Sequence, residues 1–338
     1  MTVATVTERA ELVEMAREFA RRELTPRVVA LDAGDPAVIA GCWRQLVELG
    51  LDRALLEEEH GGAGLGILDL LAAIEELAVG DGGIALCVLL CNAALATLAP
   101  EPLASIPEGA RWVLVPVRAG TEVTISNGQL DGRIACALGA HEADGLVLVG
   151  PRSTPIGISA ATPGLEVQYD ETQMGLRAAP AASILLAGVI AQSDMAATDG
   201  AESLALLRTG TAAIARGIAR RAYEMALEYA QARHQGGVAI VEHDAVSDML
   251  AAMAVRLAVP LPTATGETQA LAAKIAQTDA AVTTTIDAVQ VFGGTGYMRE
   301  TGIEKLMRDA KYCQLFPEPN WVAQDELMCL ERRRKAIR

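Results

Sequence analysis

Aromatic side chains are scarce in this sequence. Phe, Trp and Tyr make up only 3% of its 338 residues, although 51% of the residues are hydrophobic. Alanine, leucine and valine must therefore fill the interior, and this composition favours closely packed helices. A chain of this length can bury a sizeable core and is expected to form two or three domains.

Basic residues are also in short supply. The 28 Lys and Arg residues are outnumbered by 43 Asp and Glu residues, and the resulting net charge of −15 repels the phosphates of nucleic acids. No basic patch with interleaved aromatic residues is present in the sequence. We therefore expect no nucleic-acid partner.

The sequence lacks the signatures of a metal site, a leader and a membrane span. Its six cysteines include no CxxC pair, and no His or acid follows Cys87 and Cys91 at ligand spacing. Both are predicted to be buried free thiols, and no metal is expected. The N-terminus lacks the basic segment followed by an apolar segment that is typical of a signal peptide. The apolar run 84–99 is short for a membrane span and contains Asn92, so we predict a buried helix in a cytoplasmic protein without membrane contact.

Hydrophobic spacing predicts helices at both ends of the chain and strands between them. Apolar positions at helical intervals predict helices over 8–30, 36–49, the segment between Asp69 and Asp81, 84–99, 200–232, 243–258 and 267–292. Short β-type runs separated by turn signals predict strands over 112–117, 121–125, 145–150, 164–169 and 183–190.

The order of these segments predicts an α+β fold with three consecutive domains. An N-terminal helical domain covers 1–105, a middle antiparallel β-barrel or sandwich covers 106–195, and a C-terminal helical bundle covers 196–338. The turn dipeptides Asn127-Gly128 and Asp131-Gly132 favour the antiparallel arrangement of the middle domain.

Five landmarks in order resemble the acyl-CoA dehydrogenase family across essentially the whole chain. They are EEEHGGAGLG with EELAVGDGG, YAQARHQGGVAIVEHDAVSDMLAAMA, AAKIA, and DAVQVFGGTGY followed by EKLMRDAKYCQLF. The resemblance implies an N-terminal helical domain, a middle β domain and a C-terminal four-helix bundle, usually assembled as a tetramer. It also implies FAD-dependent oxidation of acyl-CoA thioesters at the α,β bond, in which FAD carries the redox step and a carboxylate takes the α-proton.

The residues that this family uses to hold the FAD pyrophosphate are largely present. In the family each FAD lies across a pair of subunits, and the neighbouring chain holds its pyrophosphate end. Arg233 matches the pyrophosphate arginine, whose guanidinium suits bidentate phosphate contact. Gly236 stands where the family usually has an aromatic residue. The further positions that match FAD contacts are Gln290, Gly293, Gly294 and His243.

The segments that would face the flavin ring depart from the family pattern. A Thr-Glu-Pro segment is replaced by Val115-Pro116-Val117, and a Trp-Ile-Thr segment is replaced by Cys136-Ala137-Leu138. The ring-stacking indole and the hydroxyl donors are both missing. We therefore expect this chain to bind no flavin ring of its own.

The catalytic base is missing from both positions that the family uses. Counting from Arg308-Asp309-Ala310, the glutamate position holds Pro317, and the alternative position before Arg208 holds Leu207. Glu318 is the only substitute, one residue late. In an extended segment such a shift turns a side chain to the opposite side, so a solvated or helix-capping acid is the competing interpretation.

The sequence therefore predicts an incomplete subunit of a heteromeric acyl-CoA dehydrogenase. A full-length paralogue would supply the glutamate and most of the acyl-CoA site in an α2β2 tetramer, and this chain would complete the FAD site shared with that partner. Some bacterial members built in this way act on steroid or other bulky side chains. Two alternatives remain: a self-sufficient homomeric enzyme that uses Glu318 as the base, and a flavin-free scaffold or CoA-thioester-binding module.

Overall fold

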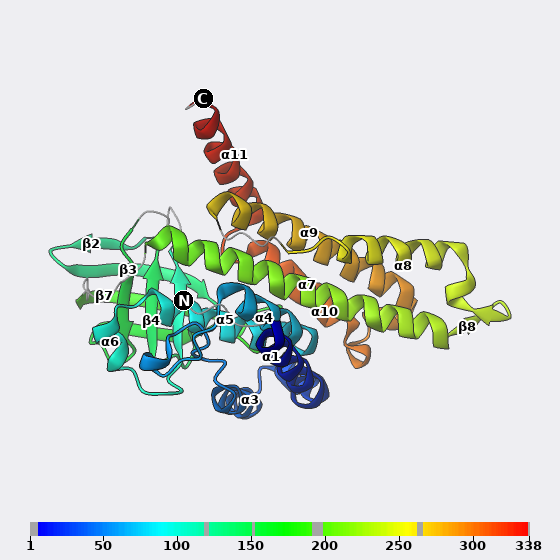
Figure 1. Ribbon diagram of the computed structural model, residues 1–338, viewed down its shortest axis with the longest axis horizontal. Helices are drawn as coiled ribbons and strands as arrows, with labels where there is room; N and C mark the ends of the chain where they lie inside the picture. Colours follow the sequence, from blue (N-terminus) through cyan, green and yellow to red (C-terminus); the bar gives the residue numbers. More distant parts are fainter. Residues whose placement is uncertain (1–5, 118–121, 151–152, 191–198, 262–265, 337–338) are drawn as a thin grey trace.

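The chain folds in sequence order into a helical region, a β region and a second helical region (Figure 1). The computed structural model describes residues 6–117, 122–150, 153–190, 199–261 and 266–336. The order of the three regions confirms the predicted α+β class, with helices at both ends of the chain and strands between them. The predicted boundary at residue 195, the first residue of the predicted strand 121–125 and the extreme ends of the chain lie outside the described residues.

The N-terminal region is organised around one fully enclosed helix, α5 (Gly82–Thr97), in which every residue but Ala96 is buried. Asn92 is tolerated there because its amide donates to Leu51 O and its carbonyl accepts from the Leu55 amide. This confirms the predicted buried helix. The surrounding helices are α1 (Val6–Phe19), α2 (Val28–Ala33), α3 (Pro36–Glu48), α4 (Ile67–Gly80) and α6 (Pro100–Ala104), with a 3₁₀ turn at Glu58–His60.

The first predicted helix is not continuous. An α-helix was expected over 8–30, but α1 passes into a π-helical segment, Ala20–Leu24, and a 3₁₀ turn, Thr25–Arg27, before α2 begins. Pro26 cannot donate to the helix ladder, and its ring crowds the preceding turn, which accounts for the change in winding.

The β region contains two small sheets. One has the strand order β1-β4-β5, formed by β1 (Trp112–Pro116), β4 (Gly145–Val149) and β5 (Ile156–Ser159). The other has the order β2-β3-β7-β6, formed by β2 (Thr124–Ser126), β3 (Gln129–Ala137), β7 (Ala182–Ile190) and β6 (Leu165–Tyr169).

The predicted all-antiparallel arrangement fails at one pair of strands. β1 pairs with β4 in parallel, although every other pairing in the two sheets is antiparallel. Both strands are almost entirely buried, so they lack the alternation of buried and exposed residues that marks a one-sided antiparallel strand. Asn127-Gly128 forms the turn between β2 and β3, where the antiparallel prediction is confirmed. The predicted turn at Asp131-Gly132 is wrong, because both residues lie within β3, where its register with β7 shifts.

The C-terminal region is a bundle in which α7, α8, α9 and α10 lie together, whereas α11 projects away from them toward the C-terminus (Figure 1). α7 and α9 cover the predicted segments 200–232 and 267–292. Gly217 lets α7 approach α4 closely, because an added Cβ at this position would lie 2.3 Å from Glu75 O. The elements are α7 (Gly200–Ala232), β8 (His234–Gln235), β9 (Val238–Ala239), α8 (Asp244–Leu257), α9 (Glu267–Phe292), α10 (Ile303–Leu315) and α11 (Asn320–Ala336), with 3₁₀ turns at Ile240–Glu242, Gly293–Tyr297 and Arg299–Thr301.

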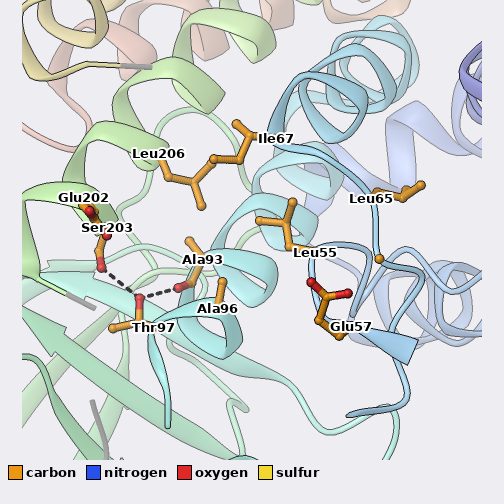
Figure 2. A pocket seen from close by; sticks show the side chains of 11 residues that line it. Leu55, Glu57, Leu65, Ile67, Ala93, Ala96, Thr97, Glu202, Ser203 and Leu206 are labelled. Atoms are coloured by element: carbon orange, nitrogen blue, oxygen red, sulfur yellow. Dashed lines mark hydrogen bonds between the residues drawn. The ribbon is translucent and has the colours of Figure 1, made fainter. Parts of the chain in front are cut away.

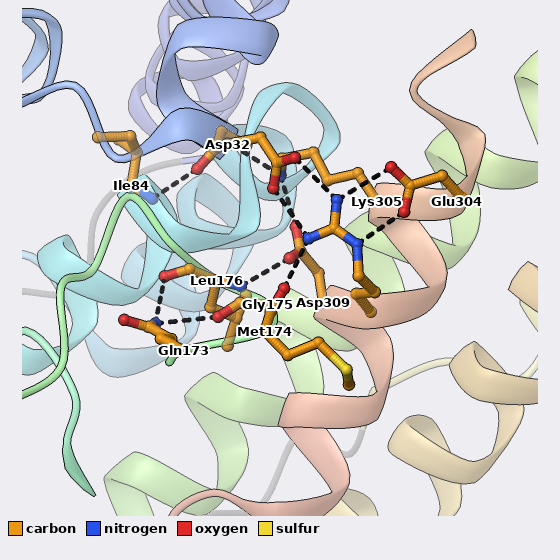
Figure 3. Close-up of polar contacts among 11 residues, drawn as sticks. Asp32, Ile84, Gln173, Met174, Gly175, Leu176, Glu304, Lys305 and Asp309 are labelled. Carbon is orange, nitrogen blue, oxygen red and sulfur yellow. Dashed lines mark hydrogen bonds and ion pairs between the residues drawn. The ribbon is translucent and has the colours of Figure 1, made fainter. Parts of the chain in front are cut away.

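A buried charge cluster joins the three regions (Figure 3). Lys305 Nζ of α10 lies 2.9 Å from Asp81 Oδ2 and 2.5 Å from Asp309 Oδ2, and all three side chains are almost completely buried. The second oxygen of Asp81 accepts from the Ile84 amide and so caps α5. The second oxygen of Asp309 accepts from the Leu176 amide in the loop before β7. One ammonium group thus connects the N-terminal helices, the β region and the bundle.

Arg308, which directly precedes Asp309 on α10, reinforces this junction. Its guanidinium pairs with Asp32 at 2.8 Å and with Glu304 at 2.6 Å. It also donates to Met174 O. The Lys305 and Arg308 interactions together fix the position of α10 relative to both other regions.

Removing the Lys305 ammonium should strongly destabilise the fold. Lys305→Met leaves two buried carboxylates without their cation, and we expect the free energy of unfolding to fall by about 3–5 kcal/mol. Lys311→Met on the exposed side of the same helix is the matched control and should change it by under about 0.5 kcal/mol. Denaturant unfolding measures both variants, and equal effects would contradict the central role of the cluster.

Candidate functional site

The predicted FAD contacts gather at one end of the bundle, on the right in Figure 1. The rings of Tyr229 and Phe292 stack with centroids 4.2 Å apart, which brings the C-terminal ends of α7 and α9 together. Arg233 follows α7 directly, and the turn that starts at Gly293 follows α9 directly. We call Arg233, His243, Gln290, Gly293 and Gly294 the phosphate clasp.

The position of Arg233 suits a side chain that binds an anion. It caps the end of α7, its carbonyl accepts from the Ile240 amide, and its side chain is exposed. Within the part of the chain that the structure describes, no acid pairs with its guanidinium. This argues against a merely structural surface ion pair and leaves both guanidinium edges available to a phosphate.

His243 stands against the hairpin formed by β8 and β9. Its Nε2 lies 3.1 Å from Gln235 O, and its ring is 3.6 Å from the point where a Gly236 Cβ would lie. Gly236 has a φ of +65°, a conformation that suits glycine. Gly236 replaces the aromatic residue that the family usually has, and the hairpin backbone, not a cavity, therefore lies beside the His243 imidazole.

The glycine turn exposes its backbone where a ligand can approach. Gly293 has a φ of +61°, and a Cβ at Gly293 or Gly294 would meet no atom within 4 Å. Gln290 is exposed on the last turn of α9. Gly296, by contrast, is buried, and a Cβ there would lie 2.5 Å from Val289 O. The first two glycines fit a ligand contact, whereas the third serves helix packing.

The segments assigned to the flavin ring lack the indole and the hydroxyl donors of the family pattern. Val115 and Leu138 are buried, whereas Cys136 is exposed and adopts a φ of +55°. Burial, followed by the neighbouring Cys136 thiol, raises the pKa of Tyr312 to about 12. The Tyr312 hydroxyl of α10 therefore lies against Cys136.

The two base positions are closed. Leu207 is fully buried, and Pro317 is buried at the end of α10. Glu318 is also buried, and its Oε1 accepts from Arg208 Nε at 3.1 Å. A second acid, Glu326 of α11, pairs with the same guanidinium at 2.6 Å. The interpretation of Glu318 as a solvated acid is therefore wrong, because Arg208 draws its carboxylate inward.

Lys274 completes this closed cluster from α9. Its ammonium group is fully buried and donates to Gln314 O, Glu318 O and Asn320 Oδ1. Burial lowers the pKa of Lys274 to about 8, and the nearby Glu318 carboxylate opposes part of that shift. A proton acceptor at Glu318 would have to break its pairing with Arg208 before it could reach a substrate.

Neither a metal site nor a membrane span is found in the described ranges. No three His, Cys, Asp or Glu side chains there gather closely enough to hold an ion. No helix there is both long enough and apolar enough to cross a bilayer. Cys87 and Cys91 are buried free thiols as predicted. Burial raises their pKa values to about 11 and about 12.

Two models of one protein family match the chain. The acyl-CoA dehydrogenase N-terminal domain matches residues 7–101, and the acyl-CoA dehydrogenase C-terminal domain matches residues 200–316. The two matches together cover more than half of the sequence. The chain belongs to the acyl-CoA dehydrogenase family. This confirms the family that the five landmarks predicted.

Members of this family resemble the chain over nearly its full length. Cyclohex-1-ene-1-carbonyl-CoA dehydrogenase from Geobacter metallireducens is 28% identical, over 94% of this chain and 97% of that protein. The enzyme of the same name from Syntrophus aciditrophicus is 27% identical, over 94% and 88%. The structure of butyryl-CoA dehydrogenase from Megasphaera elsdenii has a TM-score of 0.81 at 25% identity, and covers 96% of this chain and 98% of that one. These relatives support the predicted enzyme class, an acyl-CoA dehydrogenase oxidoreductase.

Sequence reasoning missed the buried cations of the acyl-CoA dehydrogenase fold. Arg208, Lys274 and Lys305 organise the closed base position and the domain junction, yet none was predicted to do so. A signal was present for Arg208 and Lys274, because both stand among mostly apolar neighbours on their helices, whereas Lys305 is flanked by Glu304 and, one turn later, by Arg308 and Asp309. A charge in such a setting is expected to be paired.

Glu318 should act in stability and not as a base. Glu318→Gln removes one charge partner of the buried Arg208, and we expect the free energy of unfolding to fall by about 2 kcal/mol. Glu242→Gln, at an exposed position, is the control and should have little effect. Unfolding and turnover are measured on the same preparations. Unchanged stability with lost turnover would instead identify Glu318 as the base.

Lys274 should make the stability depend on pH in a defined window. Between pH 8 and about 10.5 the folded Lys274 binds fewer protons than the unfolded one, so its contribution to the free energy of unfolding rises with pH, by about 1–3 kcal/mol. The rise should be present in wild type and in Lys311→Met, and lost in Lys274→Met. Denaturant unfolding at several pH values tests this, and parallel profiles for all three proteins would contradict it.

Proposed function

We propose that this chain is the non-catalytic subunit of a heteromeric, FAD-dependent acyl-CoA dehydrogenase. A full-length paralogue in an α2β2 assembly carries the acyl-CoA thioester and the proton-abstracting glutamate. One observation carries the proposal: the phosphate clasp of this chain is open, whereas its base position is closed by its own ion pairs.

The closed base position leaves no room for a substrate carbon. Leu207 is fully buried, and Leu89 of α5 packs so tightly on Gly210 of α7 that an added Cβ would lie 2.3 Å from its side chain. Arg208 and Lys274 occupy the polar side of the same region with Glu318. Opening this packing would expose a buried ion pair and a leucine core, and both changes cost free energy.

The phosphate clasp retains groups that can bind the phosphates of a dinucleotide. It offers an exposed guanidinium, an exposed amide side chain and two glycines without steric obstruction. This set suits the pyrophosphate of FAD, the cofactor that supplies the redox step when bound. Because the segments of this chain that match the ring-facing positions lack the indole and the hydroxyl donors, the clasp serves a flavin whose ring is seated in the partner.

Exposed apolar side chains around the phosphate clasp support a partner at this end of the bundle. Val238, Ile286, Tyr297 and Met298 are between 42% and 79% exposed. Ile286 and Tyr297 lie on α9 and the glycine turn, Met298 follows that turn, and Val238 lies on β9 between Arg233 and His243. Tyr and Met are enriched in protein–protein interfaces. A partner that covers them also shields the phosphates of the shared cofactor from water.

The relatives favour a bulky acyl group as the substrate of the assembly. Both cyclohex-1-ene-1-carbonyl-CoA dehydrogenases are named for a ring-bearing thioester. We extend this to a ring-bearing or steroid side-chain thioester bound mainly by the partner. All six cysteines are free thiols, which suits a reducing compartment such as the cytoplasm.

Flavin content tests the division of labour. If only one chain of each pair seats a flavin ring, the purified complex should hold two FAD per four chains. Absorbance of released flavin against total protein, together with the mass of the complex, gives the ratio. One FAD per chain, or turnover by this chain alone, would contradict the proposal and favour the homomeric alternative.

The phosphate clasp itself is tested by removing its cation. Arg233→Ala should weaken FAD retention by the co-purified complex roughly tenfold to a hundredfold, because a charge-assisted phosphate contact is lost. Arg44→Ala, exposed on α3, is the matched control and should retain FAD normally. Equal FAD retention in both variants would instead favour a flavin-free scaffold.

A further inference from the structure

A cavity lies at the other end of α7 from the phosphate clasp, and Leu206 in its wall directly precedes Leu207 of the base position (Figure 2). Its volume is about 280 Å³, and it opens between the loop before α4, the end of α5 and the first turns of α7. This space equals that of roughly nine water molecules at about 30 Å³ each. The residues that form its apolar wall are Leu55, Leu65, Ile67, Ala93, Ala96 and Leu206.

Small side chains create the cavity, and a hydroxyl pair forms its polar floor. Ala93 and Ala96 leave the α5 side open, whereas Leu206 of α7 covers the opposite side. Thr97 Oγ1 donates to Ala93 O at 2.7 Å and lies 2.9 Å from Ser203 Oγ. The floor is therefore held by hydrogen bonds between α5 and α7 and does not need water to satisfy it.

Two carboxylates set the charge preference at the opening. Glu57 and Glu202 line the cavity, and Figure 2 shows them on opposite sides of it. Both are exposed, and no basic side chain engages either of them in the described part of the chain. A negatively charged ligand is repelled there, and the repulsion adds to the net charge of −15. An ammonium group is attracted.

We infer that this cavity binds a small apolar molecule with an ammonium group, such as an aliphatic or alicyclic amine. The alkyl body fills the wall between Leu55 and Leu206, and the ammonium group lies between Glu57 and Glu202. The same charges disfavour a free fatty acid, whose carboxylate would lie at the opening. The proposed ligand therefore differs from the acyl-CoA thioester of the heteromer.

Three ligands of equal length test the inference on the intact chain in the assembly in which it purifies. Octylamine, n-octanol and octanoate have nine or ten non-hydrogen atoms and differ in charge. Titration calorimetry should give saturable binding with octylamine roughly tenfold tighter than octanoate and with n-octanol between them. Octanoate binding as tightly as octylamine, or no saturable binding of octylamine, would overturn the inference.

Two pairs of variants locate the binding. The double variant Glu57→Gln/Glu202→Gln should abolish the preference for octylamine over octanoate. The double variant Glu58→Gln/Glu59→Gln changes the net charge equally and should keep that preference. Ala96→Leu should fill the cavity and weaken both octylamine and n-octanol, whereas Ala251→Leu on exposed α8 should not. Equal effects within either pair would place the ligand elsewhere. Unfolding curves confirm that each variant is folded.

Discussion

The buried ammonium of Lys305 is the interaction on which the arrangement of this protein depends. It satisfies Asp81, which also starts α5, and Asp309, which also holds the loop before β7. A lone charge at such depth would be prohibitively costly, so the three groups are stable only together. The cluster places α10 against both other regions, and α10 in turn carries Tyr312 and leads into Pro317. The position of the segment that carries Pro317 and Glu318 therefore depends in part on one buried cation.

Basic side chains lie at both functional regions, but they are paired at one region and available to a ligand at the other. At the base position, Arg208 and Lys274 are neutralised internally by Glu318 and by carbonyl oxygens, so no charge remains for a ligand. At the phosphate clasp, Arg233 stays exposed and unpaired within the described residues. A folded chain with satisfied charges at one site and an available cation at another is suited to assist a neighbour's chemistry without performing its own.

Most helices were predictable because their signals are local. The 3.6-residue spacing and the absence of internal proline gave α7 and α9 with correct ends, and the apolar run gave α5. The parallel pairing of β1 and β4 was not predictable, because a fully buried strand has no alternation from which its direction could be inferred. The clasp positions came from matching motifs, whereas the true environment of Glu318 depended on Arg208, 110 positions away in the sequence. Contacts of that separation leave no periodic trace.

The length of α7 sets the distance between the base position and the phosphate clasp. Arg208 and Arg233 stand on or directly after one uninterrupted helix, and 25 residues of helical rise at 1.5 Å each separate them by roughly 38 Å. A fully stretched flavin nucleotide is shorter than such a rod. Arg233 and the base position thus lie at opposite ends of α7, and this separation supports the proposal that the cofactor held at one end serves a base on another chain.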